Sequence, residues 1–423
     1  MQAIEYDAFL ECNSLYEVYN LSALEIIPEE YDYGCVAYYA YVVHDSLDDE
    51  PLKDVSINGI DFKNSGDIWV LVGYQGNKSS IEINDIFYNG KRVTDIKIAR
   101  RAFAYNYSIQ SVVLGSSVSS IGASAFENCP NLVAVDMQNS EVTVIKQFSF
   151  NGCTALETIL LSDKLERIES EAFMHCSSLK NIDIKSSMKE LGYGAFRECT
   201  SLEAIDLSKT SLSYLDWGTF YNCNSLTEVK LPDTIKYIGS EVFYNCNSLT
   251  SITLPESLGS IDYNAFYDCI SLVEVYNLSN IHITLGDMNN GCVALYAIVV
   301  HNSLNAIKVK LHTMIEDGIV YSFAGYNGDW YLYNIENPNG NYVGAIRLPE
   351  LDVNQKRYLY SISGKGLNPD FSEIIIPSDI KHIRDYTLGY YSYGTIYFEG
   401  DESDWNKITN GCGTEATVRY YSD

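Results

Sequence analysis

Basic residues are scarce in this chain. Its 28 lysines and arginines stand against 56 aspartates and glutamates, which gives a net charge of −28. Nucleic acid phosphates and anionic lipid repel such a chain, so neither is expected as a partner. Long apolar runs are also missing, and no stretch reaches the length of a membrane span. We therefore expect no membrane insertion of this segment.

Catalytic and metal-binding motifs are absent too. The sequence has no His-Glu-x-x-His, no Gly-x-Ser-x-Gly, no phosphate-binding glycine loop and no Cys-x-x-Cys. The acidic runs at 45–50 and 401–404 lack the alternating ligands of a calcium loop. We predict no enzyme activity, no cofactor and no metal. A glycosidase with paired carboxylates stays an alternative, because such pairs need only spatial proximity.

A repeated phenylalanine is the strongest positive signal. It recurs every 23 or 24 residues, and a cysteine follows it by three positions. The phenylalanines are Phe126, Phe150, Phe173, Phe196, Phe220, Phe243 and Phe266. A fixed period in this range indicates one small unit copied along the chain, with each copy burying its apolar face against its neighbours. The chain is therefore predicted to be a solenoid.

One unit shows how each coil is built. Leu226, Val229 and Leu231 alternate with polar residues, which predicts a short strand with one buried side. A turn follows, and Ile238-Gly239 then leads to Phe243, an aromatic large enough to fill the middle of the coil. Equivalent strand phrases recur in every copy, so we expect them to stack into one long parallel sheet.

The phrase L-x-x-I-x-L-P followed by I-G-x-x-A-F-x-x-C resembles the BspA-like class of leucine-rich repeats, closely over about 100–280. The resemblance implies an α/β repeat fold, a leucine-rich-repeat solenoid with a parallel β-sheet on its concave face, interrupted here by irregular β-rich modules. It also implies a secreted or surface-displayed protein that binds host or neighbouring-cell macromolecules. Catalysis is not among the roles that the resemblance implies.

The sequence has a second, longer periodicity in addition to the phenylalanine repeat. Residues 4–47 align without a gap onto 261–304, with 25 of 44 positions identical. His44 and His301 are one such identical pair. They could be paired metal ligands, but duplication of the whole module explains them equally well. Both modules continue to a Gly-Tyr-x-Gly turn. The chain thus opens inside a repeat, and we expect it to be a fragment of a longer protein.

Five segments follow from these two periods. We predict the end of a preceding array at 1–22, a β-rich module at 23–98 and the main array at 99–280. A second module should occupy 281–365, and a degenerate repeat with a C-terminal cap 366–423. The degenerate repeat has a strand phrase at Phe371, Ile374 and Ile376 but has Leu388 where phenylalanine is expected.

Eight of the eleven cysteines share one phase of the repeat and should form a buried ladder. They are Cys12, Cys129, Cys153, Cys176, Cys199, Cys223, Cys246 and Cys269. We interpret each thiol as a small apolar group in a tight corner, although the spacing alone would not forbid a disulfide. Asn106 replaces the cysteine in one copy and could bond backbone groups there.

Function is then expected on a surface. The outward strand positions predicted to contact a partner are Glu157, Lys180, Asp183, Glu203, Asp206, Glu228, Lys230 and Tyr276. A second candidate surface is the tyrosine cluster at Tyr38, Tyr39, Tyr41, Tyr390, Tyr391 and Tyr393. We predict an extracellular or cell-surface, non-catalytic protein that binds a protein or glycoprotein ligand, such as host matrix or mucin. The alternatives are a targeting segment of a larger surface enzyme and a structural stalk.

Overall fold

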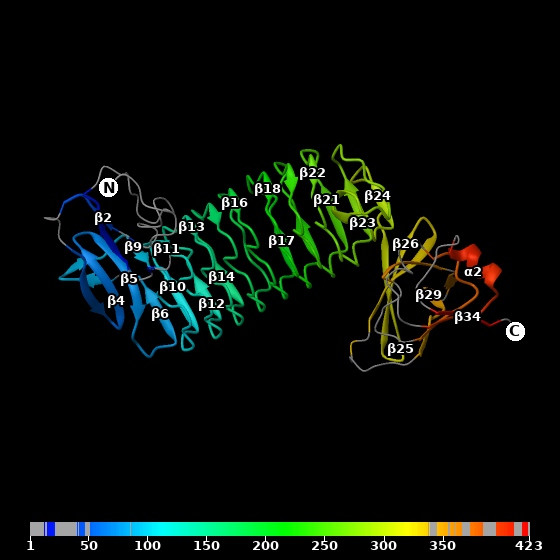
Figure 1. The fold of residues 1–423 in the computed structure, drawn as a ribbon, viewed down its shortest axis with the longest axis horizontal. Coiled ribbons are helices and arrows are strands. Elements are labelled where there is room, and N and C mark those ends of the chain that lie inside the picture. Colours follow the sequence, from blue (N-terminus) through cyan, green and yellow to red (C-terminus); the bar gives the residue numbers. More distant parts are fainter. Residues whose placement is uncertain are drawn as a thin grey trace. The chain divides into compact units, whose positions relative to one another are not determined.

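The computed structural model describes residues 12, 15–21, 40, 42–46, 51–84, 86–336, 338, 345–353, 356–358, 360–365, 373–383, 395–409 and 417–421 (Figure 1). The chain divides into two compact units, Met1–Cys199 and Thr200–Asp423. This division falls inside the repeated segment and does not test the five segments expected from the sequence, which remain predictions.

In the first unit, the L-x-x-I-x-L phrases form a four-stranded parallel sheet. Its strands are β6 (Ser80–Ile83), β10 (Ser111–Leu114), β12 (Ala134–Asp136) and β14 (Thr158–Leu160). The register places each apolar residue beside its equivalent in the next coil, so Val112 lies opposite both Ile81 and Val135. All three side chains are buried, because alternate residues of a strand point to the same side.

A second ladder runs through the same coils, where the sequence indicated only a turn with an apolar anchor. It begins with an antiparallel meander and continues with parallel strands that each contribute a few residues. The strands are β3 (Lys53–Ile57), β4 (Ile60–Ser65), β5 (Ile68–Tyr74), β9 (Ile96–Ile98), β11 (Val118–Ile121), β13 (Val144–Ile145), β15 (Arg167–Ile168) and β16 (Glu190–Leu191). The described part of this unit also contains two short pairs, the parallel β1 (Glu17–Tyr19) and β2 (Val42–His44) and the antiparallel β7 (Phe87–Tyr88) and β8 (Lys91–Arg92).

The second unit repeats both ladders. The L-x-x-I-x-L phrases form β17 (Ala204–Asp206) with β19 (Glu228–Lys230), and β21 (Ser251–Leu254) with β23 (Glu274–Asn277) and β24 (Val299–His301). The other ladder contains β18 (Tyr214–Leu215), β20 (Tyr237–Ile238) and β22 (Ser260–Ile261). A short 3₁₀ turn, η1 (Asn290–Cys292), precedes β24.

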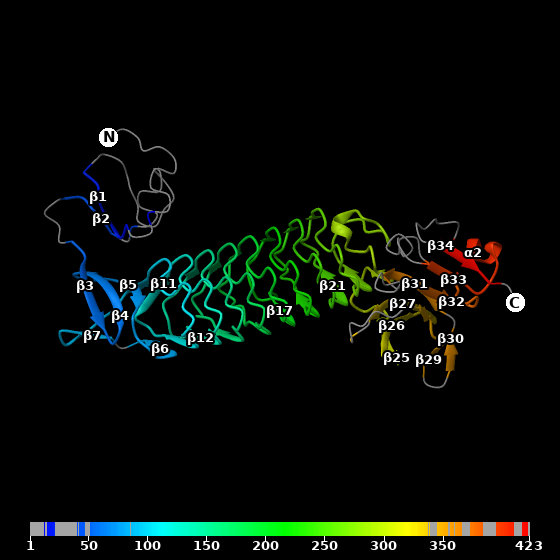
Figure 2. The same cartoon turned by 60° about the horizontal axis from the view of Figure 1, so that its bottom comes forward.

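After the coils, the second unit has an antiparallel meander and then a second group of parallel strands (Figure 2). The meander is β25 (Lys310–Glu316), β26 (Ile319–Tyr326) and β27 (Asp329–Glu336), with β31 (Tyr360–Lys365) parallel to β27. The parallel group is β28 (Ala345–Arg347), β32 (Glu373–Ile376), β33 (Thr395–Phe398) and β34 (Thr417–Tyr420). The described residues of this part also contain a hairpin, β29 (Leu351–Val353) and β30 (Lys356–Tyr358), and the helix α2 (Glu402–Thr409). Three of the four parallel strands, β32 to β34, lie within 366–423, where the sequence indicated one weak repeat and a cap.

Stacked phenylalanines fill the coils, as predicted. In the first unit the ring of Phe126 lies 4.8 Å from Phe103 and 5.2 Å from Phe150, with interplanar angles of 2° and 3°. In the second unit Phe243 stacks on Phe220 at 5.5 Å and on Phe266 at 5.0 Å. Each of these rings is almost completely buried, which makes the stack the centre of the core.

The cysteines are buried beside this stack and bond to it. Cys129 Sγ donates to Phe103 O at 3.0 Å, and Cys176 Sγ donates to Phe150 O at 3.2 Å, so each thiol reaches the phenylalanine carbonyl of the preceding coil. The same bond recurs at Cys153, Cys199, Cys246 and Cys269. At the corner without a cysteine, Asn106 Oδ1 accepts from the amides of Ser108 and Ile109. Cys12, expected in the ladder, is exposed.

Three further expectations need correction. The α/β description is not confirmed, because the segments that carry the phenylalanines are turns with left-handed residues such as Glu171 and His175, which a right-handed helix excludes. Leu179–Ile184 buries its apolar residues but is not a regular strand. The two Gly-Tyr-x-Gly segments are not equivalent, since Tyr74 ends the third strand of one meander and Tyr326 ends the second strand of the other. Leu388, expected in the last repeat, lies outside the described residues.

Candidate functional site

The predicted contact residues of the first unit lie on the surface beside the L-x-x-I-x-L strands. Glu157 precedes β14, Lys180 occupies the matching position of the next coil, and Asp183 lies three residues after Lys180; all three side chains are exposed. Lys185 Nζ bridges Asp183 Oδ2 at 2.8 Å and Asp163 Oδ1 at 3.3 Å, and the hydrogen bond to Asp183 raises the pKa of Lys185. Charged groups of neighbouring coils therefore pair across this surface.

The second unit has the same arrangement. Glu203, Asp206, Glu228 and Lys230 are exposed, and Lys230 Nζ lies 3.1 Å from Glu228 Oε1 and 3.4 Å from Asp206 Oδ2. Hydrogen bonds from the Ser208 hydroxyl and amide to Asp206 Oδ1 keep the pKa of that carboxyl below its ordinary value. The parallel register of β17 and β19 places Asp206 opposite Lys230. The sequence thus indicated these four positions but not their pairing.

Tyr276 does not share this surface. It is buried, and its hydroxyl donates to Glu274 Oε1 at 2.9 Å, so the expectation that it points outward is corrected. The same oxygen lies 2.9 Å from His301 Nε2 and accepts from Val309 N at 3.0 Å. Burial, and then the bond to Glu274, raises the pKa of Tyr276 to about 12. Three donors thus converge on one carboxylate oxygen.

The first unit contains the counterpart of this cluster. Glu17 Oε2 lies 3.1 Å from His44 Nε2 and accepts from Leu52 N at 3.0 Å, and the rings of Tyr19 and His44 stack at 4.4 Å. Each of these residues precedes its partner in the second unit by the same 257 positions that relate His44 to His301. The histidines stood out in the sequence and the glutamates did not, although the identity of the glutamates in both copies was a usable signal.

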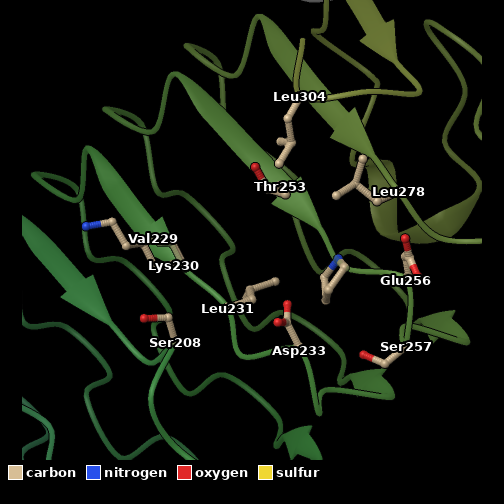
Figure 3. Close-up of a pocket in the computed structure, with 11 residues that line it drawn as sticks. Ser208, Val229, Lys230, Leu231, Asp233, Thr253, Glu256, Ser257, Leu278 and Leu304 are labelled. Atoms are coloured by element: carbon tan, nitrogen blue, oxygen red, sulfur yellow. The ribbon is translucent and has the colours of Figure 1, made fainter.

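A groove of about 810 Å³ opens in the second unit along the turns that follow the strands (Figure 3). Leu231 and Asp233 follow β19, and Pro255 and Glu256 follow β21, where Glu256 occupies the position equivalent to Asp233. Leu278 follows β23, and Leu304 comes from the segment after β24. No sequence pattern pointed to this groove, because Leu304 lies beyond the last copy that carries the repeated phenylalanine.

Two further observations concern metal sites and membrane spans. Among the described residues, no group of three or more histidine, cysteine or acidic side chains is placed to hold a metal ion. Within the same residues, no helix is long and apolar enough to cross a membrane. The tyrosines at 38, 39, 41, 390, 391 and 393 lie outside the described part of the chain.

The repeats match a known family. The family model described as "BspA type Leucine rich repeat region (6 copies)" matches residues 96–217 and 194–312, a stretch that spans just over half of the 423 residues. The chain belongs to the BspA-type leucine-rich repeat family. The matched residues contain the stacked phenylalanines and the thiol bonds described above, so the features that form the core of this BspA-type chain are those of the repeat itself.

Several solved structures are similar to this BspA-type chain. A leucine-rich repeat protein of T. pallidum is 27% identical over 47% of this chain and 91% of its own, with a TM-score of 0.42. A leucine-rich repeat protein from Bacteroides ovatus is 18% identical over 87% of this chain and 90% of its own, with a TM-score of 0.45. A leucine-rich cell surface protein of Faecalibacterium prausnitzii is 19% identical over 86% of this chain and 99% of its own, with a TM-score of 0.39. None of the curated proteins compared with the chain matches it. The family assignment rests on the repeats.

Proposed function

We propose that this BspA-type chain is an extracellular, non-catalytic binding protein that recognises a protein or glycoprotein through the exposed face of its L-x-x-I-x-L strands. The residues proposed for contact are those exposed on that face: Glu157, Lys180, Asp183, Glu203, Asp206, Glu228 and Lys230. We propose a curved, concave form for this face, as the repeat class implies.

The pairing of charges between neighbouring coils carries the proposal. Lys230 is held between Asp206 and Glu228, and the backbone beneath them is fixed by a parallel ladder over a buried core. A surface of this kind is ordered before a partner arrives, so little conformational entropy is lost on binding. Leucine-rich repeat proteins generally mediate protein binding, which favours the same function.

The test is binding to an array of extracellular-matrix proteins, mucins and glycans at physiological salt. One variant combines Asp183→Asn, Asp206→Asn, Glu228→Gln and Lys230→Gln. A control variant combines Glu166→Gln with Lys189→Gln, an exposed ion pair on the other ladder. We expect saturable binding that the first variant loses and the control keeps. Binding to nothing on the array, or equal loss in both variants, would contradict the proposal.

A structural stalk is the second candidate, and the phenylalanine stack favours it. Within the first unit the rings from Phe103 to Phe196 stack without interruption, which stiffens the coils that carry them. A stalk would hold its shape and bind no partner. The same array separates the two functions, because a stalk gives no saturable binding with the unmodified chain.

A further inference from the structure

The wall of the groove in the second unit is fixed by the buried glutamate. Leu304 is 58% exposed and lies in the segment between His301 and Val309. Glu274 Oε1 contacts both ends of that segment, His301 Nε2 at 2.9 Å and Val309 N at 3.0 Å. An exposed leucine on a segment anchored at both ends provides an apolar wall that exists before any ligand binds.

The charges of the groove favour a cation. Asp233 and Glu256 are exposed, occupy the same turn position in successive coils, and have no ion-pair partner among the described residues. Lys230 also lines the groove, but Asp206 and Glu228 already neutralise it. The carboxylates thus outnumber the cation, and the local potential is negative, as it is for the whole chain.

The apolar side chains restrict what kind of cation fits. Leu231 and Leu278 are half-buried, and with Leu304 they line the groove near the two carboxylates (Figure 3). A small metal ion would use the carboxylates and leave the leucines uncovered. A lysine or arginine side chain matches both, because its methylene stem covers apolar surface while its charged end reaches an oxygen.

The spacing of the carboxylates favours an extended occupant. Equivalent positions of stacked coils are about 4.8 Å apart, and alternate side chains of an extended peptide are about 6.6 Å apart. Flexible lysine or arginine side chains easily span that difference. We propose that the groove receives an extended segment of a partner protein in which basic residues, paired with Asp233 and Glu256, alternate with aliphatic residues that contact Leu304. This inference rests on the proposed binding function and names its partner's chemistry.

The probe is a short fluorescein-labelled peptide in which lysine alternates with valine, compared by fluorescence anisotropy with peptides that carry glutamine or glutamate in place of lysine. The groove variant combines Asp233→Asn with Glu256→Gln, and a second variant is Leu304→Ser. The control is Glu166→Gln, because Glu166 is a half-exposed carboxylate beside the other ladder and is not among the proposed contact residues. These residues are on the surface, so all variants should fold.

We expect the lysine peptide to bind at about 0.15 M salt, more weakly as salt rises. The groove variant should weaken binding at least about tenfold and Leu304→Ser a few-fold, while the control keeps full affinity. Equal affinity for the glutamine peptide, or full affinity in the groove variant, would overturn the inference. If the matrix or mucin ligand found in the first test binds the groove variant unchanged, this inference fails while the proposed function stands. If the unmodified chain binds no ligand on the array, the proposed function is contradicted instead.

Discussion

Between Phe103 and Phe196 each coil repeats one aromatic contact, whereas around Glu274 a single oxygen holds three different donors. In the coils, every phenylalanine inside the stack has an equivalent ring on both sides. In the cluster, Tyr276, His301 and Val309 depend on one group that nothing nearby duplicates. The stacked coils are thus stabilised by contacts that recur, whereas the cluster around Glu274 is stabilised by contacts that occur once.

The largest expected effect comes from breaking the stack. Phe173→Ala removes a buried ring that lies between Phe150 and Phe196, and we expect a loss of about 3–5 kcal/mol in the free energy of unfolding. Chemical unfolding followed by circular dichroism measures it. Phe87→Ala is the control, because that ring is 58% exposed and its loss should change stability by less than about 0.5 kcal/mol. Similar losses in both variants would contradict the stacked core.

The next effect tests the dependence on single contacts. Glu274→Ala leaves three donors without their acceptor and should cost about 2–3 kcal/mol. Glu17→Ala should cost about 1 kcal/mol, because the Glu17 side chain is 28% exposed against 10% for Glu274, so water can replace it more easily. Unfolding measures both, and faster hydrogen exchange at the Val309 amide should accompany the first. Equal costs would show that the two copies of the cluster are equivalent.

A smaller effect comes from two glycines with similar backbone angles. Gly291 has φ +63° and Gly66 has φ +56°, so alanine is strained at both, by about 1–2 kcal/mol. At Gly291 the added methyl would also lie 2.5 Å from Asp262 O, while at Gly66 it would meet nothing within 4 Å. We therefore expect Gly291→Ala to destabilise the chain more than Gly66→Ala in thermal unfolding. The reverse order would contradict the tight packing at Gly291.

The smallest effect concerns reactivity rather than stability. Burial raises the pKa of the Cys176 and Cys246 thiols well above its ordinary value, so these groups stay neutral at pH 8 and should resist alkylation in the native chain. Cys12 is exposed and should react. Peptide mapping by mass spectrometry after brief iodoacetamide treatment tests this. Rapid labelling of Cys176 without denaturant would contradict the buried ladder.

The sequence predicted those parts of the structure in which the same contact recurs. Phe173 and Cys176 repeat with a fixed period, and their burial follows because each copy needs a neighbour to cover it. Three of the seven exposed positions of the candidate site, Asp206, Glu228 and Lys230, follow from alternation along a strand, as around the buried Val229. The other four lie outside the regular strands. These inferences need only local pattern and repetition.

What the sequence could not predict depends on contacts that occur once. Tyr276 occupies the same strand position as the partly exposed Thr253, but His301 and the segment that ends at Val309 cover it. The groove has the same origin, since Leu304 lines it from beyond the last phenylalanine-bearing copy. The phrase ending in Pro377 predicted β32, whereas its parallel neighbour β28 was missed, although the phrase ending in Pro349 was a signal for it.

The bond from each cysteine to the preceding phenylalanine carbonyl has a consequence for how such genes change in length. Cys153 bonds Phe126 and Cys176 bonds Phe150, so donor and acceptor always belong to adjacent copies. If recombination removed one whole copy, the next cysteine would meet an identical carbonyl, and no bond type would be lost. Gain or loss of complete copies is therefore nearly neutral for folding, whereas a frame-preserving deletion of a few codons would separate the thiol of that copy from its acceptor.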